Sequence, residues 1–177
     1  MYELEADRIN NNEMFLVKID TKYCNYLRTF DHKVPYNYKD KQTRPFIGVL
    51  FKVNDIMYFA PLFSPKPKHL KLKAKLDLLK IDSGKLGVIN FNNMIPVDIS
   101  NIMVIDLDKN STIKEKQQYI SLLRKQLYWL NRNSDKIYGR SKKLYDKYIN
   151  NTLDEKTKMR CCNFPLLEEK CAEYNSN

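Results

Sequence analysis

Hydrophobic residues are most concentrated in two neighbouring segments, Phe46–Val53 and Ile56–Leu62. Both segments are rich in β-branched and aromatic residues, and the Asn54-Asp55 pair between them is a two-residue turn signal typical of a β-hairpin. Because nearly every position is apolar, both faces of each strand should be covered by other parts of the protein. The pattern therefore predicts an antiparallel hairpin at the centre of a sheet.

Shorter segments on either side predict further strands. Phe15–Ile19 has strand-like composition, and Asp20 or Thr21 can cap a helix that continues to about Phe30. A polar, turn-rich segment at 31–43 predicts a loop, and loops of that length are often functional. Leucines alternate with lysines through 66–80, which also suggests a strand. Together with Lys85–Phe91 and Ile99–Leu107, these segments predict a small, strongly bent antiparallel sheet or partly closed barrel.

The last third of the chain has helical periodicity. A helix should begin at Ser111 or Thr112 and end near Asn131–Asn133, and a second should follow over Ser134–Ile149. Asn163–Tyr174 predicts a final short helix. The length of 177 residues suits one domain, so the fold class expected is α+β with a single domain over 14–177. Residues 1–13 are acidic and Asn-rich, which suggests a flexible extension.

Charge narrows the choice of partner. The formal net charge is +10, which favours a polyanion such as nucleic acid. The two predicted helices within 114–147 carry ten Lys and Arg residues against three acids, and aromatic residues lie among them. This combination suits phosphate contacts and base stacking, although a solvated helix face over a sheet is an alternative for any one residue.

Other classes of function find little support in the sequence. The chain has no apolar run long enough to span a membrane, and the alternation of leucine and lysine in 66–80 argues against an interfacial helix. Four cysteines occur without a CxxC pair, and only two histidines are present, so we expect no metal site and no cofactor. Free thiols are typical of a reducing cytoplasm, which is the location expected.

A proline-rich segment follows the second hairpin strand. Pro61, Pro65 and Pro67 prevent the strand from continuing and surround Ser64 and Lys66. An antiparallel hairpin brings its two open ends together, so Arg44, before the first strand, should share one sheet edge with Ser64 and Lys66. A hydroxyl and several cations at one edge suit an anionic ligand. An ordinary proline-rich surface turn is the alternative.

Several motifs follow one another along the chain: Lys33-Val34-Pro35, Arg44-Pro45-Phe46-Ile47-Gly48, the run from Ala60 to Lys66, the run from Lys85 to Pro96, and the run from Leu166 to Cys171. Together they resemble the motifs of the ToxN/AbiQ family, the toxins of type III toxin–antitoxin and related phage-abortive-infection systems. The resemblance covers about residues 14–174. It implies a compact, bent barrel with flanking helices and a metal-independent endoribonuclease that leaves 2′,3′-cyclic phosphate and 5′-hydroxyl ends.

The resemblance also implies partners and site residues. The antitoxin would be a small RNA pseudoknot that the toxin cuts from a repeat array, and the two would close into a heterohexamer of three toxins and three RNAs. Cellular or phage RNA would be the substrate. The matching catalytic positions are Tyr23, Arg44, Ser64, Lys66 and Tyr119.

In this assignment Arg44 clamps a phosphate, because a guanidinium does not give up its proton. Lys66 serves as general acid or base, and a tyrosine orients the ribose or relays a proton. For Tyr23, burial in the core is the alternative. Relatives often carry a small hydroxyl residue where this chain has Phe63, which could instead stack on a base. Further RNA contacts are expected at Lys33, Tyr38, Phe63, Lys68, Lys71, Lys73, Arg124 and Lys125. A non-catalytic basic RNA-binding protein is the alternative function.

Overall fold

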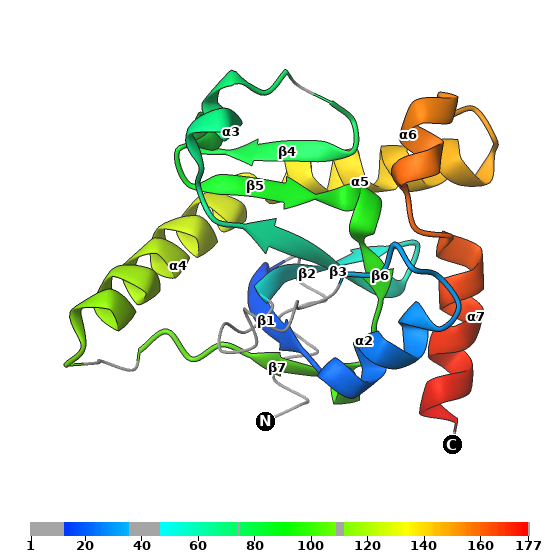
Figure 1. Ribbon diagram of the computed structural model, residues 1–177, viewed down its shortest axis with the longest axis horizontal. Coiled ribbons are helices and arrows are strands. Elements are labelled where there is room, and N and C mark those ends of the chain that lie inside the picture. Colours follow the sequence, from blue (N-terminus) through cyan, green and yellow to red (C-terminus); the bar gives the residue numbers. More distant parts are fainter. Residues whose placement is uncertain (1–12, 36–46, 74, 109–111, 177) are drawn as a thin grey trace.

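The fold is α+β, with an antiparallel sheet flanked by helices (Figure 1). The computed structural model describes residues 13–35, 47–73, 75–108 and 112–176. The strands are β1 (Phe15–Ile19), β2 (Ile47–Val53), β3 (Ile56–Phe63), β4 (Leu78–Ile81), β5 (Gly87–Asn90), β6 (Ile95–Pro96) and β7 (Ile102–Val104). The helices are α2 (Thr21–Arg28), α3 (Pro67–Lys71), α4 (Lys114–Arg132), α5 (Ser134–Ile149), α6 (Glu155–Arg160) and α7 (Phe164–Asn175).

The predicted hairpin is confirmed and lies at the centre of the sheet. β2 pairs with β3 from Gly48 opposite Pro61 to Val53 opposite Ile56. Asn54 and Asp55 both have positive φ angles, 48° and 68°, as a tight two-residue turn requires. The strand order is β4-β5-β3-β2-β1-β7, and β6 pairs with β3 beside this path. Among the described strands β4 and β7 form two separate ends, so the sheet is open and is not closed into a barrel.

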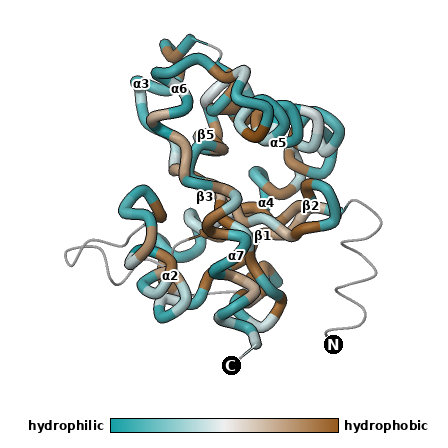
Figure 2. The backbone as a smooth tube through the Cα atoms, turned by 90° about the vertical axis from the view of Figure 1, so that its right-hand side faces the viewer, coloured by the Kyte–Doolittle hydropathy of each residue, from teal (hydrophilic) through white to brown (hydrophobic). Residues whose placement is uncertain are grey.

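One hydrophobic core joins the sheet to the helices. Val17, Phe51 and Phe59 from the strands are fully buried together with Leu130 of α4 and Leu144 of α5. Hydrophobic positions concentrate along the central strands, as Figure 2 shows. None of the helices in the described ranges is long and apolar enough to cross a membrane.

Local sequence signals explain the helix boundaries. The Asp20 side chain accepts a hydrogen bond of 3.0 Å from the backbone N–H of Lys22, which caps α2 as predicted. Asn163 caps α7 in the same way through the backbone N–H of Leu166. The predicted span Ser134–Ile149 is confirmed for α5. The short helix α6 was not predicted.

The strand expected within 66–80 is wrong for its first part, which forms α3. Pro67 occupies the first turn, where its fixed φ and missing N–H suit a helix. The backbone N–H of His69 donates a 2.8 Å hydrogen bond to the carbonyl of Lys66, which closes the first turn. Among the described residues of this segment, the strand begins at Leu78, as β4, and continues to Ile81. The strand expected over Ile99–Leu107 shortens to β7, because a 3-10 turn over Ile99–Asn101 precedes it.

Candidate functional site

The end of β3 presents the residues that the sequence analysis placed at the centre of the site. β3 ends at Phe63, and Ser64, Pro65 and Lys66 follow it on the surface. The Phe63 side chain is 39% exposed. An aromatic ring, a hydroxyl and an ammonium group are therefore accessible within four consecutive residues.

Gly87 supports this surface from the neighbouring strand. It has a φ of +108°, and a Cβ atom there would lie 2.1 Å from the carbonyl oxygen of Phe63 and 3.3 Å from the backbone nitrogen of Pro65. Only glycine allows so close an approach with this backbone conformation. Phe63 also pairs with Val88 of β5, so β5 fixes the position from which Ser64 projects.

The helix α3 continues the site as a short basic surface. Lys68, Lys71 and Lys73 are exposed, as is Lys66 at the helix N-cap. His69 is buried on the inner side of this helix. Burial lowers the pKa of His69, and the nearby charges of Lys68 and Lys66 lower it further. The imidazole is therefore uncharged at neutral pH, and the positive charge of α3 comes from its lysines.

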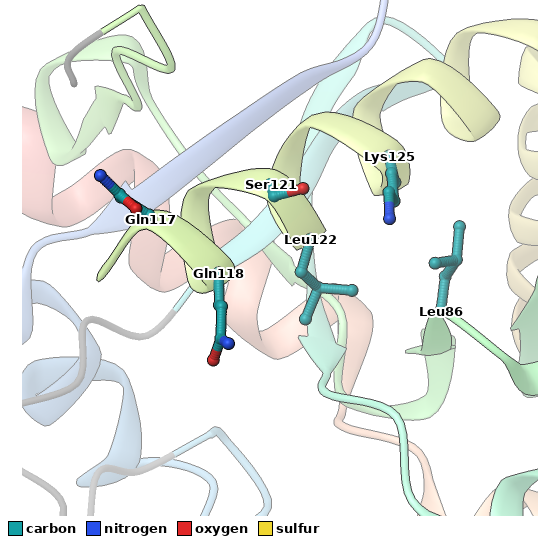
Figure 3. Close-up of a pocket in the computed structure, with 6 residues that line it drawn as sticks. All are labelled: Leu86, Gln117, Gln118, Ser121, Leu122 and Lys125. Carbon is teal, nitrogen blue, oxygen red and sulfur yellow. The ribbon is translucent and has the colours of Figure 1, made fainter. Parts of the chain in front are cut away.

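The helix α4 joins the site through a buried amide. The side chain of Gln126, which is 2% exposed, donates a 2.7 Å hydrogen bond to the carbonyl of Leu86, the residue before Gly87. A pocket of about 430 Å³ lies beside this contact, and Figure 3 shows Leu122 and Lys125 of α4 near Leu86 there. Gln117, Gln118 and Ser121 complete its lining. The amide contact thus ties a basic helix face to the strand that supports Ser64.

Two further predicted residues lie on α4. Tyr119 is half-buried and packs against the hydrophobic core. Arg124 is exposed, and its Nε donates a 2.9 Å hydrogen bond to the carbonyl of Leu107. Arg124 therefore anchors the segment after β7 to α4. Because this hydrogen bond occupies part of the guanidinium, fewer of its N–H groups are available to an RNA phosphate than the sequence suggested.

Tyr23 lies in the core and away from solvent. Its side chain is 0% exposed, and its hydroxyl donates a 2.7 Å hydrogen bond to the carbonyl of Pro96. Its ring also meets Tyr174 of α7 edge-on, with centroids 5.1 Å apart. Burial raises the pKa of Tyr23, so the hydroxyl keeps its proton. These contacts match the alternative in which Tyr23 is a core residue.

Lys33 is also engaged in the fold. Its ammonium donates a 2.5 Å hydrogen bond to the carbonyl of Cys161, and its own carbonyl accepts one of 2.9 Å from Asn93. Arg44 and Tyr38 lie outside the described residues, so their predicted place beside Ser64 stays a prediction. The extension predicted over 1–13 lies outside them too, apart from Glu13.

Gln126, Leu86 and Gly87 were not predicted from the sequence as residues of the site. Gln126 interrupts the apolar stripe that Leu123, Leu127 and Leu130 form along α4, and such a polar residue on a buried face signals a specific hydrogen bond. In the described part of the chain, no group of three His, Cys, Asp or Glu side chains lies close enough to hold a metal ion. All four cysteines are free thiols, as expected.

Comparison with known proteins identifies the class to which this fold and surface belong. The sequence profile described as "Toxin ToxN, type III toxin-antitoxin system" matches residues 15–172. Endoribonuclease ToxN of Bacillus thuringiensis subsp. kurstaki is 38% identical over 160 residues, 88% of this chain and 81% of the relative. Endoribonuclease AbiQ of Lactococcus lactis subsp. lactis is 30% identical over 167 residues, with 89% and 87% covered.

Solved structures agree with these relatives. One, from a study of selective toxin inhibition by a non-coding RNA pseudoknot in type III systems, superposes with a TM-score of 0.73 at 36% identity and covers 93% of this chain and 99% of that one. The lactococcal anti-phage endoribonuclease AbiQ gives 0.74 at 27% identity, with the same coverage. The chain belongs to the ToxN family of type III toxin–antitoxin systems, which confirms the family that the sequence motifs predicted.

Proposed function

We propose that this protein is a metal-independent endoribonuclease toxin whose active site is centred on Ser64 and Lys66. The observation that carries the proposal is the exposure of both side chains at the end of β3, on backbone held in place by Gly87. The basic surfaces of α3 and α4 flank this position and suit a polyanionic substrate. The relatives named above as endoribonucleases support the same activity.

The proposed reaction is an attack within the RNA itself, which requires two proton transfers and stabilisation of negative charge on the phosphate. The 2′-hydroxyl oxygen of the RNA attacks the adjacent phosphorus, and the bond from phosphorus to the 5′ oxygen breaks. One proton leaves the 2′-hydroxyl and one is added to the departing 5′ oxygen, so the products carry a 2′,3′-cyclic phosphate and a 5′-hydroxyl. The Ser64 hydroxyl and the Lys66 ammonium donate hydrogen bonds to the phosphate oxygens, where negative charge develops.

The other predicted residues have separate roles. Lys66 and Tyr119 would transfer the two protons, and Arg44 would clamp the phosphate. Phe63, exposed next to Ser64, would stack on the base beside the cleaved bond. We assign Tyr23 a structural role in the core, because its hydroxyl donates a hydrogen bond to the carbonyl of Pro96 and its side chain has no exposed surface.

The antitoxin proposed for this toxin is an RNA pseudoknot. Solved relatives include a toxin that a non-coding RNA pseudoknot inhibits and an antiviral system regulated by a processed non-coding RNA. By analogy, this protein would cut its antitoxin from a repeat array and assemble with it in the cytoplasm as a closed complex of three toxins and three RNAs. Its targets would be cellular or phage RNA.

Product analysis tests the proposal. The purified protein is incubated with adenine-rich RNA in excess EDTA, and the 5′ ends are labelled with polynucleotide kinase. We expect fragments that accept label without prior phosphatase treatment, as 5′-hydroxyl ends do. Fragments with 5′-phosphate ends, or activity only after Mg²⁺ is added, would contradict the mechanism. Salt-sensitive RNA binding without cleavage would indicate the alternative, a non-catalytic RNA-binding protein.

A further inference from the structure

A second pocket lies towards the C-terminal end of α4. It encloses about 380 Å³ between β4, the turn after it, and the junction of α4 and α5. Trp129 and Asn133 line it from the α4 side, and Lys136 and Arg140 line it from α5. Its opposite wall consists of Leu78, Leu79, Lys80, Asp82 and Ser83. The pocket therefore combines one aromatic side chain with three cations and one carboxylate.

The walls of this pocket are fixed by hydrogen bonds to the backbone. The guanidinium of Arg140 donates to the carbonyls of Lys75 at 2.5 Å and Leu78 at 3.0 Å. The ammonium of Lys80 donates to the carbonyl of Leu70 in α3 at 2.9 Å. Arg140 and Lys80 thus hold β4 between α5 and α3. The pocket is consequently preformed, which lowers the entropic cost of binding a ligand.

Lys136 is the cation available for a ligand. It is exposed, and within the described part of the chain its ammonium has no hydrogen bond or ion pair. Trp129 is half-buried and packs against the core on one side. Asp82 would repel a phosphate but can accept hydrogen bonds from the amino group of a base. The charges therefore orient a nucleotide, with its phosphate towards Lys136 and its base edge towards Asp82.

The two pockets lie along one face of α4. Gln118, Leu122, Lys125 and Trp129 recur at spacings of four, three and four residues, which places them in a single stripe. On the other side of both pockets is the segment that joins β4 to β5, through Asp82, Ser83 and Leu86. A strand of RNA that lies along this stripe would pass from the pocket beside Leu86 to the pocket at Trp129.

We propose that the Trp129 pocket binds one nucleotide of single-stranded RNA, with the base stacked on the indole ring and its phosphate at Lys136. The pocket would hold the RNA on a part of the surface separate from Ser64 and Lys66. It would increase affinity for RNA without taking part in cleavage. The inference rests on the proposed function as an RNA-binding toxin.

Trp129 is the one tryptophan in the sequence, so its fluorescence reports directly on this pocket. The experiment uses full-length protein with Ser64→Ala, to prevent cleavage, and a single-stranded oligoadenylate of about ten nucleotides, within the range that single-strand sites cover. Fluorescence anisotropy of dye-labelled RNA measures binding independently of the pocket. We expect tryptophan emission to be quenched as RNA is added, with the same midpoint as the anisotropy change.

Matched variants locate the contact. Lys136→Ala in the same background should weaken binding by about three- to tenfold, because one phosphate contact is lost. Lys143→Ala removes the same charge from the same helix about 10 Å further along, outside the pocket, and should change affinity by less than about twofold. Trp129→Ala should weaken binding by about tenfold or more, and Trp129→Phe should retain most of the affinity.

The outcomes separate this inference from the proposed function. RNA binding without any change in tryptophan emission would overturn the inference, as would equal losses of affinity for Lys136→Ala and Lys143→Ala. Neither the emission measurement nor the comparison of the two lysine variants depends on Trp129→Ala, so both remain valid if that variant does not fold. RNA that produces no anisotropy change at any concentration would overturn the proposed RNA-binding function itself.

Discussion

A Cβ atom on Gly87 would lie 2.1 Å from the carbonyl oxygen of Phe63, so the first residue of β5 fits against the end of β3 only as glycine. The same Cβ atom would lie 3.3 Å from the backbone nitrogen of Pro65, so Gly87 approaches the backbone on both sides of Ser64. It links a backbone requirement in one strand to the position of the proposed active-site hydroxyl in another.

Gly87→Ala should therefore impair both the fold and the active site. The new methyl group must displace the Phe63 backbone, and the positive φ is itself unfavourable for alanine, so we expect a loss of about 1–3 kcal/mol in the free energy of unfolding. Cleavage should slow more than the unfolded fraction explains, because Ser64 moves with Phe63. Urea unfolding and single-turnover cleavage measure the two effects.

Gly139 offers a matched control for this substitution. It lies within α5, where an added Cβ meets nothing within 4 Å. Gly139→Ala should raise the free energy of unfolding by about 0.5–1 kcal/mol, since alanine favours the helix, and should leave cleavage unchanged. Equal cleavage by Gly87→Ala and wild type would contradict the role given to this contact.

Gln126→Ala should loosen the connection between α4 and the strand that supports the site. The substitution leaves the carbonyl of Leu86 without its buried donor, and we expect a loss of about 1–3 kcal/mol in stability. Gln118→Ala, on the exposed part of the same helix, is the control and should have little effect. Urea unfolding compares the two, and similar losses would argue against a specific role for the Gln126 amide.

Tyr23→Phe tests the position of Tyr23 in the core. It removes the hydroxyl that donates to Pro96 and should cost about 1 kcal/mol of stability. Because this hydroxyl is buried, the rate of cleavage by the folded protein should stay within about twofold of wild type, below the 10²-fold or more typical of a lost general acid or base. A decrease of 10²-fold or more in the cleavage rate, without a matching loss of stability, would show that Tyr23 is a catalytic residue.

Stability should fall at alkaline pH. Burial raises the pKa of the Cys24 and Cys161 thiols to about 12, from an ordinary value of 9.0. The unfolded chain loses these protons first as pH rises above 9. The stability that the protonated thiols contribute is therefore complete below pH 9 and is lost as pH rises towards 12, with a slope of up to about 1.4 kcal/mol per pH unit for each group. Urea unfolding between pH 7 and 11 measures this, and Cys24→Ser should reduce the slope.

The parts of the fold that the sequence predicted well are those encoded by neighbouring residues. The central hairpin follows from two apolar runs around Asn54-Asp55, and α5 follows from helical spacing after Asn133. The segment after Lys66 was predicted less well, because alternating leucine and lysine suit a strand while Pro67 favours a helical first turn. Packing of Gly84 against the carbonyl of His69 accompanies the helix, and such a contact is not encoded locally.

The candidate site shows the same division. The exposed position of Ser64 and Lys66 after a central strand could be predicted from the proline-rich break, and their role in cleavage stays a prediction. The contact between Gln126 and Leu86 joins residues 40 positions apart, so neither local sequence predicts its partner. Tyr23 illustrates a further limit, because the sequence left both a catalytic role and burial in the core open for it, and helical spacing does not decide between them. Its hydrogen bond to Pro96 joins α2 to β6 across 73 positions.

The most direct test of the account is single-turnover RNA cleavage in EDTA by Ser64→Ala and Lys66→Ala. Lys156→Ala, an exposed lysine in α6, serves as the control. Removing one donor to a developing negative charge commonly slows a reaction by about 10²- to 10³-fold, and we expect losses of that size for both site variants with RNA affinity largely kept. Cleavage by Ser64→Ala at a rate within about twofold of wild type would contradict the account, because the hydroxyl at the end of β3 would then have no part in the reaction.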